Sequence, residues 1–116
     1  MRPCHVDELA GGAVDCFVVG RTFVHFCKTP TLWGVLLWGR PNDEDAFELA
    51  RTLPLELQAP AVAHASIVDA SRLTGIDVNA FSQLDTYVRA EFDSLARGVK
   101  RLALVRPAGV EGAVVA

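Results

Sequence analysis

The sequence has few of the residues that usually mark a disulfide framework, a metal site or a membrane span. Its 116 residues include only three cysteines and one methionine. The cysteines are odd in number and not closely spaced, which predicts reduced thiols in a cytoplasm. The longest hydrophobic runs, such as LWGVLLW, are far shorter than the roughly 20 residues that cross a bilayer. We therefore expect a cytoplasmic protein that makes no contact with a membrane.

Neither sign of charge is in strong excess. The chain has 11 basic and 14 acidic side chains, a formal net charge of −3, and no basic cluster. Nucleic-acid binding through this segment is therefore not expected. Hydrophobic residues make up 51% of the sequence and charged residues 22%, which is typical of a folded domain. The length fits a single domain over residues 1–116.

Hydrophobic patterning predicts an α/β fold. The predicted elements are a hairpin formed by AVDCFVV and TFVHFC, a buried strand LWGVLLWG, a helix in NDEDAFELARTLP, a strand AHASIVDA that ends near Asp69, a helix from Asn79 to about Arg97, and a strand VKRLALVRP. The segment LELQAPAVA is predicted to be a connector. Strands that alternate with helices predict a mostly parallel sheet of four or more strands with helices packed against it, preceded by the N-terminal hairpin.

The end of the sequence resembles the start of another element. Residues 108–116, AGVEGAVVA, are typical of the first turns of a helix. A sheet of this kind usually continues with a complete helix and a further strand. We therefore expect the domain to be incomplete at its C-terminus and to be a fragment of a longer chain.

The sequence gives weak support for metal binding or catalysis. The soft ligands Cys4, His5, Cys16, His25 and Cys27 gather near the N-terminus, but no CxxC or HxxxH spacing occurs. A hydrolase that combines His64 with a serine would need a nucleophile setting such as GxSxG, which is absent. We expect core roles for these side chains, no metal, no cofactor and no enzymatic activity.

The stretch IVDASRLTGIDVNAF, residues 67–81, attracts attention because it follows a predicted strand. Asp69 and Asp77 bracket a segment with serine and threonine. Such a segment fits a catalytic pair, a metal site, a phosphorylation switch or simple helix capping. In parallel sheets, functional surfaces gather at the carboxyl ends of strands, so a functional role is worth pursuing.

The longer segment IVDASRLTGIDVNAFSQL resembles the signature of the STAS domain family, which comprises anti-sigma-factor antagonists and related bacterial regulators. Residues 69–71 match the D-x-S motif, Asp77 matches the second acid, and Ala80-Phe81 matches the helix entry. The resemblance covers roughly residues 32–114. It implies a STAS-like fold and a regulatory role in bacterial signal transduction or transcription.

The sequence departs from the family at the position that phosphorylation uses. In phosphorylatable members, hydroxyl residues follow the second acid, and one of them receives phosphate from a partner kinase. Val78 and Asn79 occupy these positions here, so the resemblance implies a domain that is degenerate at the phospho-acceptor position. Asparagine is a favourable residue before a helix, and Asn79 is therefore expected to cap the long helix.

These observations predict a non-enzymatic regulatory or protein-interaction module. Its partner would be another protein or another domain of the same chain, and a DNA-binding domain downstream is one hypothesis. A homodimer through the sheet edges is a further expectation. The regulatory loop that contacts the partner is expected to contain Asp69, Ser71, Thr74, Asp77, Val78 and Asn79.

An alternative function is binding of a small molecule or lipid by a STAS-like carrier or sensor. Aromatic side chains in the first part of the chain could line a pocket for a small apolar ligand, although they fill a core equally well. These residues are Phe17, Phe23, Phe26, Trp33 and Trp38.

Overall fold

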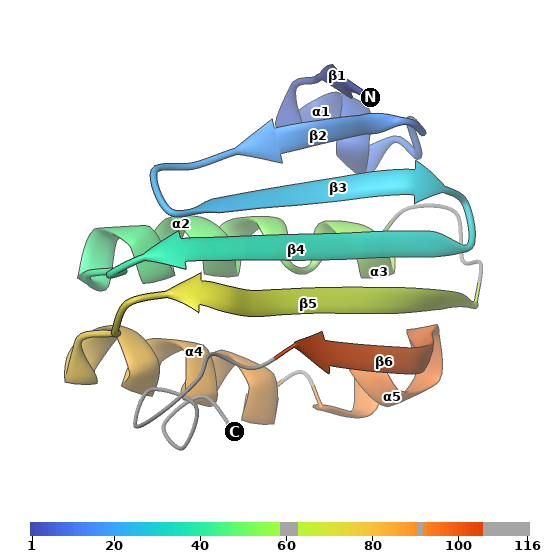
Figure 1. Ribbon diagram of the computed structural model, residues 1–116. Coiled ribbons are helices and arrows are strands. Elements are labelled where there is room, and N and C mark those ends of the chain that lie inside the picture. The colour runs from blue at the N-terminus through green and yellow to red at the C-terminus, as the bar shows by residue number, and fades with distance from the viewer. Residues whose placement is uncertain (59–62, 91, 106–116) are drawn as a thin grey trace.

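The computed structural model describes residues 1–58, 63–90 and 92–105. It is an α/β structure in which helices pack against a six-stranded mixed sheet with the strand order β1-β2-β3-β4-β5-β6 (Figure 1). The strands are β1 (Arg2–Pro3), β2 (Cys16–Val19), β3 (Phe23–Thr29), β4 (Leu32–Gly39), β5 (His64–Leu73) and β6 (Val99–Val105). The helices are α1 (Val6–Ala10), α2 (Asp43–Thr52), α3 (Leu55–Gln58), α4 (Val78–Ala90) and α5 (Phe92–Gly98).

The prediction of a mostly parallel sheet holds only for part of the sheet. Strands β4, β5 and β6 are parallel neighbours, and β1 is parallel to β2. The predicted hairpin is present as β2 and β3, but β4 is antiparallel to β3 as well. The reason is the connection, since only Pro30 and Thr31 separate β3 from β4. A two-residue turn can join antiparallel strands but not parallel ones.

Most predicted elements are found close to their expected positions. Strand β4 has the predicted bounds, and β5 continues beyond Asp69 to Leu73. The long helix predicted from Asn79 begins one residue earlier and is divided into α4 and α5. The connector predicted after Pro54 contains the short helix α3. The helix predicted at residues 108–116 lies outside the described residues.

Helix α2 illustrates how local sequence defines an element. Asn42 precedes the helix, and its side chain accepts a hydrogen bond from the amide of Asp45 at 3.0 Å. The Asp45 carboxylate in turn accepts from the amide of Asn42 at 2.8 Å, which completes a reciprocal capping box. Three acids in the first turn also interact favourably with the positive end of the helix dipole.

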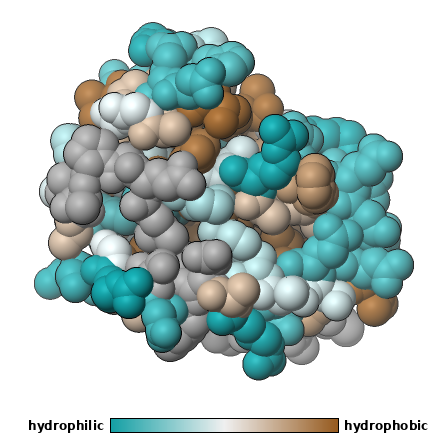
Figure 2. Space-filling view, turned by 180° about the vertical axis from the view of Figure 1, so that it is seen from behind, coloured by the Kyte–Doolittle hydropathy of each residue, from teal (hydrophilic) through white to brown (hydrophobic). Residues whose placement is uncertain are grey.

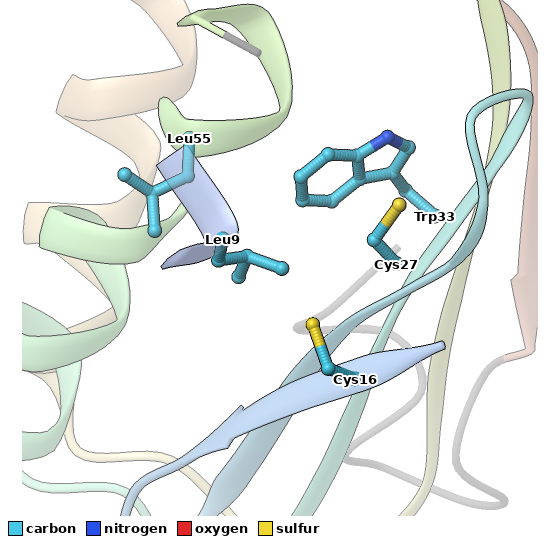
Figure 3. Packing of buried hydrophobic residues seen from close by; sticks show 5 residues of the cluster. All are labelled: Leu9, Cys16, Cys27, Trp33 and Leu55. Atoms are coloured by element: carbon cyan, nitrogen blue, oxygen red, sulfur yellow. The ribbon is translucent and has the colours of Figure 1, made fainter. Parts of the chain in front are cut away.

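Two clusters of hydrophobic residues form the core between the sheet and the helices. The first contains Leu9, Cys16, Cys27, Trp33 and Leu55, so that α1 and α3 converge on the inner face of β2, β3 and β4 (Figure 3). The second joins Phe23 and Val35 of the sheet to Leu49 of α2. Full burial of a large apolar side chain contributes about 1.5–3 kcal/mol. These contacts fix the helices to one face of the sheet.

The opposite face of the sheet is not covered by any helix in the described part of the chain (Figure 1). Phe17 and Phe26 are cross-strand partners on this face, and Phe26 also pairs with Gly34. A Cβ atom at Gly34 would collide with the Phe26 ring, so glycine allows the ring to lie flat across β4. The aromatic residues expected to share a pocket are thus divided between the two faces, because Phe23 and Trp33 are buried on the helical side.

None of the helices in the described residues is long and apolar enough to cross a membrane.

Candidate interaction site at the carboxyl end of the sheet

The parallel strands β4 and β5 end side by side, and the loops that follow them are hydrogen-bonded to each other. Gly39 ends β4 with φ +69°, a left-handed conformation that glycine adopts without steric cost. The amide of Thr74 donates to the carbonyl of Gly39 at 2.9 Å, and the amide of Asp77 donates to that of Pro41 at 3.2 Å. The two loops therefore form one surface.

An ion pair reinforces this junction. Arg40 Nε lies 2.9 Å from Asp77 Oδ1. The Arg40 side chain passes over Gly75, where an added Cβ atom would collide with the guanidinium. Both charged side chains are substantially exposed, so the pair contributes at most about 1 kcal/mol to stability. Its main effect is to orient Arg40 beside the start of α4. No local pattern in the sequence marks Arg40, because its partner Asp77 is 37 positions away.

Helix α4 begins in a different way from the prediction. The amide of Phe81 donates to the carbonyl of Asp77 at 2.9 Å. The residue whose carbonyl accepts the first helical bond is the N-cap, so Asp77 holds that position and Asn79 lies within the first turn. The prediction that Asn79 caps the helix is therefore wrong. The cause is a helix start two residues earlier than the capping argument assumed.

The start of α2 is anchored beside this junction. Asp45 accepts from Arg21 through both carboxylate oxygens, with Nε at 3.0 Å from Oδ1 and a second, very short contact from the terminal nitrogen. Arg21 also donates to the carbonyl of Arg40 at 3.4 Å. The hydrogen bond from Arg21 is the main cause that holds the pKa of the Asp45 carboxyl below its ordinary value, and the amide of Asn42 adds to it. Arg21 thereby connects the β2–β3 turn to the loop after β4.

The two helix starts enclose a surface hollow of about 580 Å³. Its lining consists of Arg40, Asn42, Asp43, Glu44, Asp77, Val78 and Asn79. One guanidinium faces three carboxylates, which gives the lining a net charge of −2. Hydrophilic residues also dominate this end of the molecule, at the right of Figure 2. Val78 differs from the polar and charged residues of the lining, because it is apolar and yet 82% exposed.

The structure brings together only part of the predicted regulatory loop. Asp77, Val78 and Asn79 line the hollow.

Asp69 and Ser71 belong to β5, where Asp69 pairs with Leu36 and Val105. Asp69 Oδ1 accepts from the amide of Ser71 at 3.0 Å and from its hydroxyl at 2.6 Å. The hydroxyl and then the amide hold the pKa of Asp69 below its ordinary value. Thr74 is exposed and joins the loop pair through its amide.

A second polar cluster, which sequence reasoning missed, is buried beneath the sheet. The Glu56 carboxylate lies between His25 Nε2 at 3.3 Å and His64 Nε2 at 2.6 Å. The three side chains are between 0% and 5% exposed. The ring of Trp33 lies against both imidazoles, with centroids 5.5 Å from His25 and 6.0 Å from His64. Both histidines had been assigned to strands, but Glu56 fell in a segment without a clear pattern.

Hydrogen bonds at both ring nitrogens orient the imidazole of His25. Thr52 Oγ1 donates to the carbonyl of Leu49 at 3.0 Å, so its single proton is already used. The hydroxyl oxygen therefore accepts from His25 Nδ1 at 3.3 Å. The other ring nitrogen, His25 Nε2, faces the Glu56 carboxylate at 3.3 Å. Burial by itself raises the pKa of the Glu56 carboxyl. The interactions with His25, and then those with His64, lower this pKa by more than burial raises it, so the pKa lies below its ordinary value.

The cysteine thiols do not resemble catalytic nucleophiles. Burial is the main cause that raises the pKa of Cys27 to about 11. Burial is also the main cause that raises the pKa of Cys4 to about 12, and a hydrogen bond to Cys16 adds to it. A reactive cysteine needs a lowered thiol pKa. Within the described ranges, no group of three or more His, Cys, Asp or Glu side chains is arranged to hold a metal ion.

Comparisons of the chain with protein-family models, curated proteins and solved structures give no match. The fold and the site define the class of protein directly: an α/β domain with a mixed six-stranded sheet and a polar hollow where two parallel strands end.

Proposed function

We propose that this chain is a non-enzymatic regulatory module, STAS-like in its element order, that binds a protein partner or another domain of its own chain. The observation that carries the proposal is the hollow in which Asp77, Val78 and Asn79 meet Arg40 and the start of α2. The loops after parallel strands are the usual place for a binding surface in such sheets. We further propose that the module acts in the bacterial cytoplasm.

The chemistry of the hollow indicates the kind of partner. Its net charge of −2 favours a basic segment, since opposite charges steer association and select partners. Val78 adds an exposed apolar side chain beside these charges. Apolar contacts at the centre of an interface with charges around them are typical of protein–protein recognition. A basic segment with one hydrophobic side chain fits this pattern.

The proposed module does not use phosphorylation at its helix entry. Val78 and Asn79 have no hydroxyl, so neither can accept a phosphoryl group as the corresponding residues of phosphorylatable STAS domains do. A phosphate there would add about two negative charges to a hollow that is already acidic. Partner binding would instead depend on the constant charges of Asp43, Glu44 and Asp77.

The experiment that tests this proposal is site-specific photocrosslinking in cells. A benzoylphenylalanine at position 78 is compared with one at position 14, because Val14 is also exposed and lies outside the hollow. We expect a defined crosslinked partner from position 78 alone. The partner is then purified, and its affinity for the Val78→Ser variant, which removes the apolar side chain without adding charge, is expected to fall at least tenfold.

Charge variants give an independent control. Asp77→Lys is expected to weaken binding of the same partner, and Arg40→Ala, which makes the hollow more acidic, is expected to strengthen it. Equal crosslinking from positions 14 and 78, or an affinity that none of the variants changes, would exclude the hollow as the binding surface.

A further inference from the structure

An apolar cavity lies between the sheet and the C-terminal helices, away from the hollow at the strand ends. Its volume is about 340 Å³. Val35 and Val68 of the sheet line it from one side, and Leu53 and Val88 line it from the helices. Glu56, Ser66 and Tyr87 contribute the polar groups of the lining. Protein interiors contain few voids larger than a water molecule, so a space of this size within a core layer is typical of a ligand site.

The cavity is accessible from solvent. Val88 and Leu102 belong to its lining, and they are 45% and 66% exposed. These two residues therefore mark an opening between α4 and β6. The volume of the cavity is roughly twice that of an engineered cavity of about 150 Å³ that binds benzene. A bicyclic aromatic body matches this volume.

The polar residues of the lining define the rest of the ligand. Glu56 is a carboxylate held between His25 and His64, and all three side chains are buried. Each carboxylate oxygen receives one histidine hydrogen bond and retains a further lone pair. A hydroxyl group can donate to that lone pair. A charged ligand fits poorly, because an anion would face Glu56 and a charge of either sign would lose its hydration in an apolar cavity.

We propose that this cavity is a binding site for a small neutral molecule with a flat or compact apolar body and one hydroxyl group. The site is separate from the proposed partner surface, since the hollow and the cavity share no lining residue among those that the structure describes. Filling the cavity restores dispersion contacts that an empty space lacks, and burial of the apolar body supplies the main driving force. The hydrogen bond to Glu56 selects the hydroxyl.

The test is an NMR titration of the whole ¹⁵N-labelled chain with 2-naphthol. Two comparison compounds have similar shape: 2-methylnaphthalene lacks the hydroxyl, and 2-naphthoate is an anion. We expect 2-naphthol to bind with shifts at the amides of Val35, Val68 and Val88, at least tenfold more tightly than the naphthoate and several-fold more tightly than the methyl compound. Binding of the naphthoate with equal affinity, or no shifts at these amides up to the solubility limit, would overturn the proposal.

Matched variants show whether the ligand occupies this cavity. Val88→Phe adds volume at the opening, while Val14→Phe makes the same change at an equally exposed position outside the cavity. We expect at least a tenfold loss of 2-naphthol affinity for the first and less than a twofold change for the second. Equal effects of the two variants would contradict the proposal. In Glu56→Gln, the preference for 2-naphthol over 2-methylnaphthalene should decrease; if that variant does not fold, the Val88 and Val14 pair decides.

Discussion

Glu56 and Asp77 are both carboxylates with basic partners, but they lie in opposite environments. Glu56 is held between two histidines beneath the sheet, and its side chain is 5% exposed. Asp77 pairs with Arg40 at the surface, where its side chain is 45% exposed. Water weakens the attraction between the surface pair and readily replaces either partner. The buried cluster has no such replacement, so the loss of its carboxylate is expected to cost much more stability than the loss of the surface carboxylate.

The largest expected effect comes from removing the buried carboxylate. Glu56→Ala leaves His25 and His64 without their shared acceptor, and we expect a loss of about 3 kcal/mol or more in the free energy of unfolding. Urea denaturation followed by circular dichroism measures this loss. Glu48→Ala, an exposed residue of α2, serves as the control and should change stability by less than about 0.5 kcal/mol. Equal effects of the two variants would show that the buried cluster is not structural.

Substitution of Asp45 is expected to reduce stability less than substitution of Glu56 and more than substitution of Asp77, because Asp45 is buried while its partner Arg21 is exposed. Asp45→Asn keeps the shape but removes the charge, and we expect a loss of about 1–2 kcal/mol at pH 7. Its folded pKa is lowered. The stabilisation by the Asp45 carboxylate is therefore fully present above the pKa of about 3.9 that an aspartate has in the unfolded chain. It is lost as the pH falls through the lower pKa of Asp45 in the folded chain.

The pH dependence of unfolding checks the Asp45 prediction. The difference in stability between the original chain and Asp45→Asn should decrease as the pH falls below about 4. Asp43→Asn, in the exposed first turn of the same helix, is the matched control. A difference that is unchanged down to the acid transition would mean that the ion pair with Arg21 does not contribute.

A smaller effect is expected from the surface carboxylate. Asp77→Ala removes the N-cap side chain of α4 and the partner of Arg40. We expect a loss of about 1 kcal/mol in the free energy of unfolding, which is typical of an N-cap change. Raising the salt concentration should reduce the part of this loss that comes from the ion pair. A loss comparable to that of Glu56→Ala would remove the contrast between the two regions.

The smallest effect is expected at Asn79. This residue is exposed in the first turn of α4 and does not cap it. Asn79→Ala should therefore change the free energy of unfolding by less than about 0.5 kcal/mol, while Asn79→Asp should leave stability similar or slightly higher through the helix dipole. A cost of about 1 kcal/mol for Asn79→Ala, with none for Asp77→Ala, would place the helix start at Asn79 after all.

The two regions also differ in how far they were predictable. Residues 77–79 of the surface site lie in one continuous stretch, and the sequence marks them as functional candidates because they follow a predicted strand and precede a predicted helix. Asp69 and Ser71 were grouped with them, but β5 continues to Leu73 and keeps these residues in the sheet. Strand ends are difficult to predict because a polar residue can pair on an open face as well as begin a loop. Arg40 and the start of α2 joined the site only through tertiary contacts.

The buried cluster could not be found in the same way. His25 and Glu56 are 31 positions apart, and nothing in the local pattern distinguishes Glu56 from a solvent-facing acid. Glu56 stands between Leu55 and Leu57 in the sequence. Such an alternation is equally typical of an exposed acid, so it indicates neither the burial of Glu56 nor its partners.

The sequence by itself determined the local elements of this protein. Apolar runs with β-branched and aromatic residues defined β2, β3 and β4, and Asn42 with its acidic neighbours defined the start of α2. These features depend on contacts between residues close in the chain, which local spacing specifies. The tertiary structure alone decided the mixed strand directions, the burial of Glu56 between two histidines, and the division between hollow and cavity. Each of these depends on which distant segments pack together, since burial and charge pairing are properties of the assembled layers.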